Sequence, residues 1–260
     1  MLIVGAGWRL PPGPTVTSCH DICHRSPAVA RHPRFPVTSV YTMTPERFQR
    51  LKETLDRRQP DLTVALENVH KPHNFSAILR TCDAVGIFAA HAVTPRGPIR
   101  ESRPTSGGSH RWVQTATYGT TTEVLDHLRQ RGFRILAADL RPGAIDYRQE
   151  DYTAPTALLM GQEKFGVSDE AAAGADGFVT IPMLGLVASL NVSVAAALIL
   201  FEAQHQRSSA GLYDRRRLDA ETWNRTLFEW SYPELAAYCQ AEGLLYPRLG
   251  AEGELLDPIP

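Results

Sequence analysis

Three polar loops of the sequence carry side chains that could bind a ligand or take part in catalysis. Their candidate residues are, in chain order, Asn74, Arg80, Gly161, Glu163, Ser189, Asn191 and Ser193. Each loop follows a short apolar run typical of a buried strand, and open α/β sheets bind ligands beyond the carboxyl ends of their strands. Amide, hydroxyl and guanidinium groups supply hydrogen-bond donors, and a glycine lets the backbone approach a ligand closely. The pattern therefore predicts a ligand site built from loops.

The same residues also have structural interpretations that need no ligand. Arg80 lies in an otherwise apolar helix, where it could form an ion pair at the edge of the core with Asp83 or Glu67. Asn74 stands where the N-cap of that helix is expected, and Ser168 is placed to cap the short helix after the second loop. Single residues do not decide between these alternatives and a ligand site.

Periodic segments on either side of the loops alternate between strand and helix. Short apolar runs predict strands over residues 62–66, 89–93, 113–118, 133–140, 156–160 and 177–181. Helical spacing of apolar residues predicts helices over residues 75–85, 123–131, 168–173 and 190–206. Strands that alternate with helices are typical of a parallel sheet covered by helices on both faces, so an α/β fold is expected.

The two ends of the chain differ from this central part. Residues 1–42 hold six of the 19 prolines and no amphipathic period, which predicts a disordered extension. Met43 is an alternative initiator methionine, with residues 1–42 as an upstream extension. A helix begins after Thr44, its expected N-cap, and a helical stretch over about residues 219–242 precedes a loose acidic tail. We therefore divide the chain into residues 1–42, a central domain of residues 43–217, and residues 218–260.

Composition excludes several classes of protein. The 260 residues carry 27 basic and 28 acidic side chains and are 43% hydrophobic, which excludes a disordered chain and a coiled coil. The net charge of −1 is uneven, because residues 1–42 carry +3, residues 43–217 carry +2 and residues 218–260 carry −6. The longest apolar run, residues 192–201, is too short to cross a bilayer.

Cysteine usage indicates a reducing compartment. Four cysteines do not form a disulfide framework in a chain of this length, and the N-terminus is a poor signal peptide, so a cytoplasmic location is expected. Cys19-His20 and Cys23-His24 have the spacing of paired metal ligands. No second pair completes a tetrahedral zinc site, so no metal is expected.

Three motifs stand intact along the central part of the chain. They are Asn74…Arg80, Gly161-x-Glu163, and Ile181-Pro182-Met183 followed by Ser189-Leu190-Asn191. In this order and spacing they resemble the signature motifs of the SPOUT methyltransferases, and within them the TrmH family of tRNA (guanosine-2′-O-)-methyltransferases. The similarity covers roughly residues 46–217 and includes residues 105–112 between the motifs.

The resemblance implies a fold that no pattern rule would predict. SPOUT proteins form an α/β domain whose C-terminal part threads a loop, which gives a deep trefoil knot, and knots are rare among protein folds. Members of this family are homodimers, with the active site near the dimer interface. A knotted domain with flanking RNA-binding helices, assembled as a homodimer, is therefore expected.

The resemblance also implies a reaction and a cofactor. Members transfer a methyl group from S-adenosylmethionine to the ribose 2′-hydroxyl of the D-loop guanosine at tRNA position 18, and they need no metal. The residues implied to hold the cofactor in a bent shape through backbone groups are Ala138, Leu140, Gly161, Ile181, Met183 and Leu190.

By the same resemblance Arg80 is the catalytic arginine. A guanidinium almost never loses its proton, so we expect Arg80 to stabilise the developing alkoxide and a neighbouring phosphate rather than to act as a base. Asn74 would orient Arg80 and the ribose. The residues implied to support the site are Glu163, Ser189 and Asn191.

Basic side chains that suit RNA phosphates flank the motifs. They lie in the first helix, after the long helix, and between the first two motifs: Arg47, Arg50, Lys52, Arg57, Arg58, Arg207, Arg215, Arg216, Arg217, His110 and Arg111. Clustered arginines match a surface that tracks phosphates. Charged runs are also common on faces that contact only solvent.

Two other functions stay open. One is 2′-O-methylation of ribosomal RNA by a related SPOUT enzyme, but residues 1–42 are too short and proline-rich for the N-terminal RNA-binding domain that such relatives often carry. The other is RNA binding without catalysis on the same fold. The intact Asn74, Arg80, Glu163 and Asn191 argue against this second alternative.

Overall fold

The computed structural model describes residues 43–69, 71–94, 111–162 and 165–258. Predictions that concern residues 1–42, His110 and Glu163 lie outside the described residues. The chain divides into two units, one of residues 56–217 and one that combines the chain up to Leu55 with residues 218–260. The first helix, α1 (Pro45–Asp56), is therefore grouped mainly with the C-terminal helices rather than with the sheet.

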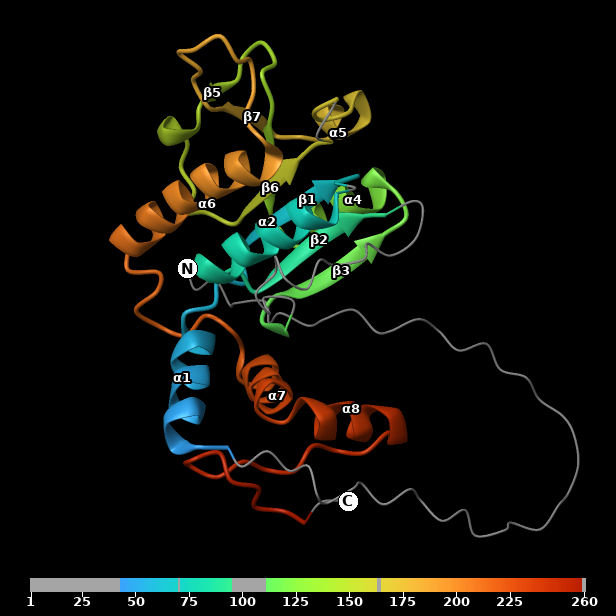
Figure 1. The fold of residues 1–260 in the computed structure, drawn as a ribbon, viewed down its shortest axis with the longest axis vertical. Helices are drawn as coiled ribbons and strands as arrows, with labels where there is room; N and C mark the ends of the chain where they lie inside the picture. The colour runs from blue at the N-terminus through green and yellow to red at the C-terminus, as the bar shows by residue number, and fades with distance from the viewer. Residues whose placement is uncertain (1–42, 70, 95–110, 163–164, 259–260) are drawn as a thin grey trace, which may run out of the picture. The chain divides into compact units, whose positions relative to one another are not determined.

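The unit of residues 56–217 is built on a sheet of seven parallel strands (Figure 1). They are β1 (Leu62–Glu67), β2 (Ala89–Val93), β3 (Gln114–Tyr118), β4 (Arg134–Ala138), β5 (Ile145–Asp146), β6 (Thr156–Met160) and β7 (Gly177–Thr180). Their order across the sheet is β3-β2-β1-β6-β4-β7-β5. The central strands β1 and β6 are buried along their whole length, as unbroken apolar runs predict. The predicted parallel sheet is confirmed, and β5 is too short to show a pattern.

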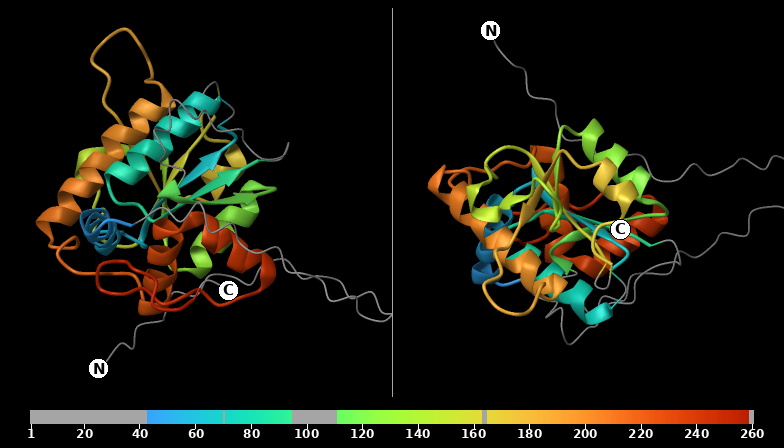
Figure 2. Two further views of the ribbon diagram at one scale, coloured as in Figure 1. Left: turned by 60° about the horizontal axis from the view of Figure 1, so that its bottom comes forward. Right: turned by 90° about the horizontal axis from the view of Figure 1, so that it is seen from above.

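Helices cover both faces of this sheet. Helix α2 (Pro72–Ala84) and helix α6 (Val192–Ser209) lie side by side on one face, as Figure 2 shows. Helix α4 (Thr121–Gln130) and the short α5 (Asp169–Ala173) contact each other on the opposite face. A 3-10 turn, Tyr147–Gln149, follows β5. Ser168 caps α5 by accepting a hydrogen bond from the amide of Ala171, as predicted.

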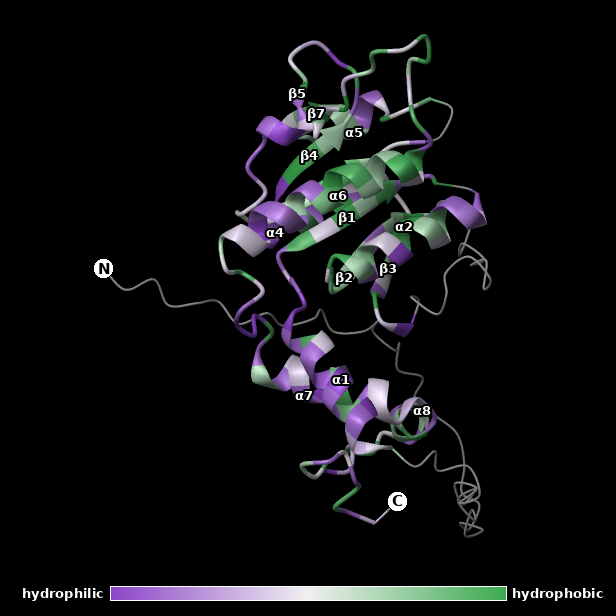
Figure 3. Ribbon diagram, turned by 60° about the vertical axis from the view of Figure 1, so that its left-hand side comes forward, coloured by the Kyte–Doolittle hydropathy of each residue, from purple (hydrophilic) through white to green (hydrophobic). Residues whose placement is uncertain are grey.

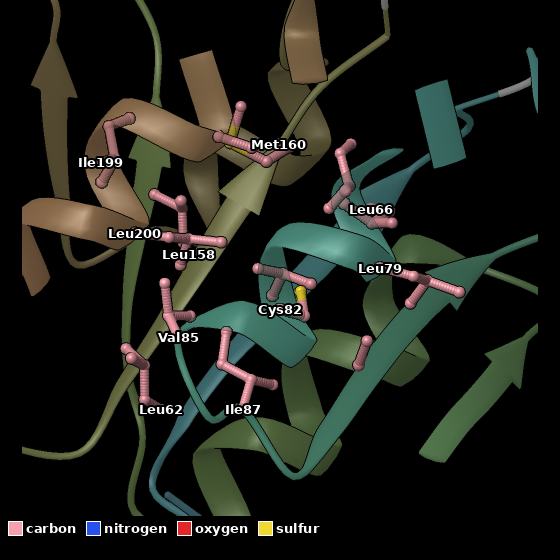
Figure 4. Packing of buried hydrophobic residues seen from close by; sticks show 14 of the residues in the cluster. Leu62, Leu66, Leu79, Cys82, Val85, Ile87, Leu158, Met160, Ile199 and Leu200 are labelled. Carbon is pink, nitrogen blue, oxygen red and sulfur yellow. The ribbon is translucent and has the colours of Figure 1, made fainter. Parts of the chain in front are cut away.

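The largest cluster of buried apolar side chains lies between the α2–α6 layer and the sheet. Figure 4 shows Leu79 and Cys82 of α2 and Ile199 of α6 facing the side chains of β1 and β6. Figure 3 shows the same distribution by hydropathy, with β1 and α6 hydrophobic and α4 largely polar on its outer side. Burial of one such aliphatic side chain stabilises the fold by about 1.5–3 kcal/mol. This layer therefore holds α2 and α6 in fixed positions relative to the strands.

Strand β7 lies between two strands that precede it in the chain. Val179 of β7 pairs with Ala138 of β4 on one side and with Ile145 of β5 on the other. The segment that joins β4 to β5 therefore passes the end of β7, and the chain after β6 re-enters a region already formed by earlier strands. The trefoil knot implied by the resemblance stays a prediction about how the chain is threaded at this point.

Arg207 of α6 is completely buried. Its guanidinium donates to the carboxylate of Asp61 at 2.8 Å, to the side-chain oxygen of Gln59 at 3.0 Å, and to backbone carbonyls that include that of Tyr152 at 2.8 Å. Asp61 also accepts from Arg217 at 2.6 Å. The network ties the end of α6 to the beginning of β1. The expectation that Arg207 contacts RNA is wrong, because no part of its guanidinium is exposed.

Arg58 is buried in the same way. Its guanidinium donates to the carboxylate of Asp83 and to the carbonyl of Ile87. Burial lowers the pKa of Arg58, and the charge of Asp83 and the hydrogen bond to it act in the opposite direction. The expectation of RNA contact is therefore wrong for Arg58 too, since a buried charge must be paired within the protein.

The other unit contains α1, α7 (Ala220–Ser231), α8 (Pro233–Glu242) and residues 243–258, which we call the C-terminal segment. The predicted single stretch over residues 219–242 is thus two helices. The chain breaks at Tyr232, since Pro233 has no amide hydrogen and starts α8 instead. The predicted loose tail is also wrong for the described residues, because Tyr246, Leu249 and Leu255 pack against the core of this unit.

The hydropathy of the helices bears on whether any of them could span a membrane. In that part of the chain, no helix combines the length and the apolar composition that crossing a membrane requires. Even α6, with 18 residues, carries polar side chains along its C-terminal half.

We predict that Arg207→Ala lowers the free energy of unfolding by about 3 kcal/mol, because it leaves buried hydrogen-bond acceptors without their donor. Urea denaturation followed by circular dichroism measures this change. Arg215→Ala is the matched control: Arg215 is exposed, so its loss is expected to change stability by less than about 0.5 kcal/mol. Equal stability of the two variants would contradict a structural role for Arg207.

Candidate active site

A cavity of about 370 Å³ lies at the carboxyl ends of β4, β6 and β7. The three strands are neighbours in a parallel sheet, so the loops that follow them meet at one edge. All six residues predicted to hold the cofactor line this cavity: Ala138, Leu140, Gly161, Ile181, Met183 and Leu190. Ser189 lines it as well. The structure therefore brings together residues that span more than fifty positions of the sequence.

The cavity has apolar and polar walls. Met160, Val179 and Ile199 form apolar parts of the lining. Asp139 lines it too, and its carboxylate accepts from its neighbour's amide and from the Nε atom of Arg141 at 2.9 Å. Hydrogen bonds to Asp139 and to Asp169 raise the pKa of Arg141, so its guanidinium stays positively charged beside Asp139. A cavity of this kind suits a ligand that has both apolar and charged parts.

Gly161 lies at a close crossing of two backbone segments. A Cβ atom built on Gly161 would lie 2.2 Å from the carbonyl carbon of Gly166 and 2.3 Å from the amide nitrogen of Val167. The amides and carbonyls of Gln162 and Gly166 exchange two hydrogen bonds, at 2.8 and 2.9 Å, which close a small loop beside the cavity. Gly161 is thus required for backbone packing as well as for approach to a ligand. Glu163, predicted to support the site, belongs to this loop and lies outside the described residues.

Asn74 and Asn191 connect the beginnings of α2 and α6. The Nδ2 atom of Asn191 donates to the Oδ1 atom of Asn74 at 3.2 Å. Asn191 is the N-cap of α6, and its Oδ1 atom accepts from the amide of Ser193 at 2.8 Å. The prediction that Asn74 caps α2 is wrong, because α2 begins at Pro72, whose ring suits the first turn of a helix. Asn74 is instead buried within that first turn.

Arg80 is exposed on α2. Its guanidinium makes no hydrogen bond or ion pair with any residue that the structure describes. The alternative of an ion pair at the core edge is wrong, since Asp83 binds Arg58 and the carboxylate of Glu67 is occupied by other donors. Arg80 does not line the cavity, so a reactant that contacts both must extend beyond the cavity mouth.

Glu67 is a site residue that sequence reasoning considered only as a partner for Arg80. It ends β1 and is 2% exposed. Its carboxylate accepts from the amide and hydroxyl of Ser168 and, at 3.0 Å, from the hydroxyl of Thr121. It therefore holds the end of the small loop after Gly161 against β1. An acidic residue that directly ends an apolar strand was the signal that could have pointed to it.

Most of the arginines expected to contact RNA are on the surface. Those that the structure leaves exposed are Arg47, Arg50, Arg57, Arg111, Arg215 and Arg216, while Arg58 and Arg207 are buried. Arg216 also binds Asp56 at 2.8 Å, so part of its charge is already neutralised. Across the described segments, no group of three or more His, Cys, Asp or Glu side chains could hold a metal ion.

Comparison with known families gives two matches. Residues 61–201 match the model of the SpoU rRNA Methylase family. Residues 205–258 match a second model, described as SpoU, rRNA methylase, C-terminal. The first match contains every described residue of the cavity and the Asn74–Asn191 contact.

Individual relatives cover most of the chain. The tRNA (guanosine(18)-2′-O)-methyltransferase of Thermus thermophilus is 60% identical over 187 residues, which are 72% of this chain and 96% of that protein. The crystal structure of the TrmH/SpoU tRNA modifying enzyme of A. aeolicus has a TM-score of 0.69 at 42% identity and covers 73% of this chain and 96% of that one. A structure of AviRb from Streptomyces viridochromogenes in complex with the cofactor AdoMet has a TM-score of 0.53 at 28% identity, over 59% and 62% of the two chains.

We predict that Gly161→Ala lowers the free energy of unfolding by about 1–3 kcal/mol, because the added methyl group forces the crossing segments apart. Hydrogen exchange of residues 162–168 should accelerate at the same time. Gly185→Ala is the matched control, since a Cβ there meets nothing within 4 Å. If Gly161→Ala unfolds at the same urea concentration as Gly185→Ala, the packing argument fails.

Proposed function

The chain belongs to the SpoU rRNA Methylase family, and from this premise we propose that it methylates the ribose 2′-hydroxyl of the guanosine at tRNA position 18. The observation that carries the proposal is the 60% identity to a relative of that name over 96% of the relative's length. The SpoU family name refers to ribosomal RNA. The names of this relative and of the A. aeolicus enzyme both refer to tRNA, which favours tRNA as the substrate. A tRNA substrate also fits the cytoplasmic location expected from cysteine usage.

S-adenosylmethionine is the methyl donor of the proposed reaction. A volume of about 370 Å³ lies in the range of small-molecule sites, about 300–1,000 Å³. The apolar strand ends suit the adenine ring and the aliphatic chain, and Asp139 supplies a negative charge for the cationic groups of the molecule. The residues proposed to hold it are Ala138, Leu140, Gly161, Ile181, Met183 and Leu190. The bound cofactor supplies an activated methyl group on a positive sulfur.

Arg80 is the proposed catalytic residue of this chain. The acceptor hydroxyl loses its proton as the new O–C bond forms, so a fixed positive charge beside the oxygen stabilises the developing alkoxide. The guanidinium of Arg80 is exposed and unpaired within the described part of the chain, and it can contact the oxygen and a neighbouring phosphate. A guanidinium retains its proton in proteins, which makes a role as general base unsuitable.

The remaining site residues position these groups. Asn74 and Asn191 join the first turns of α2 and α6 through their side-chain amides, which sets where α2 presents Arg80. Ser189 lines the cavity beside Leu190 and is proposed to support the cofactor together with Asn191 and Glu163. The exposed arginines would contact phosphates of the tRNA. No step of this mechanism requires a metal ion.

A homodimer is the proposed assembly. Val194, Leu198 and Phe201 are 48%, 39% and 51% exposed and, at positions i, i+4 and i+7, form one apolar stripe along α6. Leu184 and Leu186, in the loop that precedes α6, are fully exposed. Large apolar side chains exposed in this number are typical of an interface, and a second copy of the chain would cover them. Other residues of the same loop, Met183 and Ser189 among them, line the cavity, which would place the active site near the interface.

We predict that the wild-type enzyme methylates unmodified tRNA and that Arg80→Ala lowers kcat by at least about 100-fold, because one transition-state contact is lost. Transfer of labelled methyl groups, followed by nucleoside mapping, measures both. Binding of S-adenosylmethionine to Arg80→Ala, measured by calorimetry, should match the wild type, because Arg80 does not line the cavity.

Two controls make this experiment decisive. A tRNA with adenosine at position 18 should accept no label, and ribosomal RNA should accept none either. Label in ribosomal RNA alone would overturn the proposed substrate, whereas full turnover by Arg80→Ala would overturn only the role of Arg80.

We predict that Leu198→Asp converts the dimer into a monomer, because burying an unpaired carboxylate at the interface is unfavourable. Sedimentation equilibrium measures the change in mass. Leu245→Asp is the control: Leu245 is 93% exposed on the other unit and lies outside the α6 stripe. A wild-type chain that sediments as a monomer would contradict the proposal directly.

A further inference from the structure

The unit that contains α1, α7, α8 and the C-terminal segment has a second cavity, of about 650 Å³. Helix α1, helix α7 and the C-terminal segment each give this cavity aromatic and basic side chains. The aromatic residues are Phe48 from α1, Trp223 and Phe228 from α7, and Tyr246 from the C-terminal segment, and the basic residues are Lys52, Arg225 and Arg248. Neither the proposed reaction nor the cofactor cavity uses this site, which consists entirely of residues of one unit.

The charges on this cavity are positive although the surrounding segment is acidic. Residues 218–260 carry a net charge of −6, yet the ionisable side chains along the described wall are Lys52, Arg225, Arg248 and the phenol of Tyr246. Arg248 is bound to Asp257 at 2.8 Å, whereas Lys52 has its ammonium 5.6 Å from the centroid of the Phe48 ring. The lining residues themselves are therefore basic and none of them is acidic, although Asp257 pairs with Arg248 beside the wall, and this lining suits an anionic ligand.

Arg225 supplies the most specific indication. Its Nη2 atom is buried, and no hydrogen-bond acceptor among the described residues contacts it. A buried donor without a partner destabilises the protein, and buried polar groups in folded proteins are nearly always satisfied. A ligand that places an anionic oxygen at the cavity would supply the missing acceptor. Phosphate oxygens match a guanidinium well, because both groups form two parallel hydrogen bonds.

The aromatic part of the wall is rigid. The ring of Tyr246 stacks on that of Phe228 with centroids 4.5 Å apart and an angle of 16°, and its hydroxyl lies 3.0 Å from the carboxylate of Glu229. Phe228 and Trp223 form a largely buried floor. Aromatic rings next to arginine are the usual means by which proteins bind unstacked bases of single-stranded nucleic acid.

We propose that this cavity binds one unstacked nucleotide of the tRNA substrate, with its base against the aromatic wall and its phosphate at Arg225. This inference rests on the proposed function, which supplies the RNA. The chain's own residues 1–42 carry a net charge of +3, which is opposite in sign to the ligand that the basic wall favours. A nucleotide combines the negative charge and the planar ring that the wall matches.

Arg225→Gln tests the proposal, because it keeps a polar side chain and removes the charge. We expect the KM for tRNA and the Kd of the tRNA complex to rise about tenfold, with kcat changed less than about twofold, since the cavity holds the substrate and takes no part in the chemistry. The slope of log K against log salt should fall by about 1 for one lost phosphate contact. Arg129→Gln, an exposed arginine of α4, removes the same charge and should change neither quantity.

Binding is measured without S-adenosylmethionine, so this test is independent of turnover. If the wild type binds tRNA but methylates none, the proposed function fails while the site can still be tested. If Arg225→Gln binds tRNA as tightly and with the same salt slope as Arg129→Gln, the inference is overturned and the proposed function stands.

Two further measurements locate the nucleotide. Ultraviolet crosslinking of the wild-type complex should attach tRNA to peptides that contain Trp223 or Tyr246, and Arg225→Gln should reduce this yield about tenfold. Guanosine 5′-monophosphate is the probe for a free nucleotide. Quenching of tryptophan fluorescence by micromolar amounts of it, without any effect of Arg225→Gln on tRNA binding, would overturn RNA as the source of the nucleotide.

Discussion

The buried ion pair between Arg207 and Asp61 fixes the position of α6, and the candidate active site depends on that position. At its C-terminal end α6 is held by Arg207, which binds groups that precede β1 and β6. At its N-terminal end it is held by the amide contact between Asn191 and Asn74. A helix anchored at both ends, with an apolar face against the sheet, leaves its preceding loop little freedom. That loop supplies Met183, Ser189 and Leu190 to the cavity.

Much of the fold could be predicted from the sequence, because its main elements are regular. Runs of apolar residues marked six of the seven strands to within about two residues at each end. Local chemistry explains the errors: Pro72 starts α2 before Asn74, and Pro233 separates α7 from α8. The burial of Arg58 and Arg207 could not be predicted, since a charged residue next to other charges resembles a solvated face until its partners are known.

The candidate site was predictable to a different degree. Spacing indicated that three loops could form a site, but the six residues around the cavity were named through a resemblance and not through periodicity. The structure adds two facts that neither route supplied. Glu67 holds Ser168 through its carboxylate, and Gly161 is required by the backbone of residues 166–167. The first fact depends on two segments about a hundred residues apart coming together in space. The second depends on a tight turn that brings Gly161 against residues only five positions later.

The placement of β7 between β4 and β5 also determines when the protein can acquire its site. Residues 177–180 leave the ribosome after both of their partner strands, so the earlier part of the sheet must remain open until they arrive. Pairings of this non-local kind form slowly, and partly folded chains expose strand edges in the meantime. The order of synthesis thus makes completion of the cavity one of the last events in the maturation of the chain.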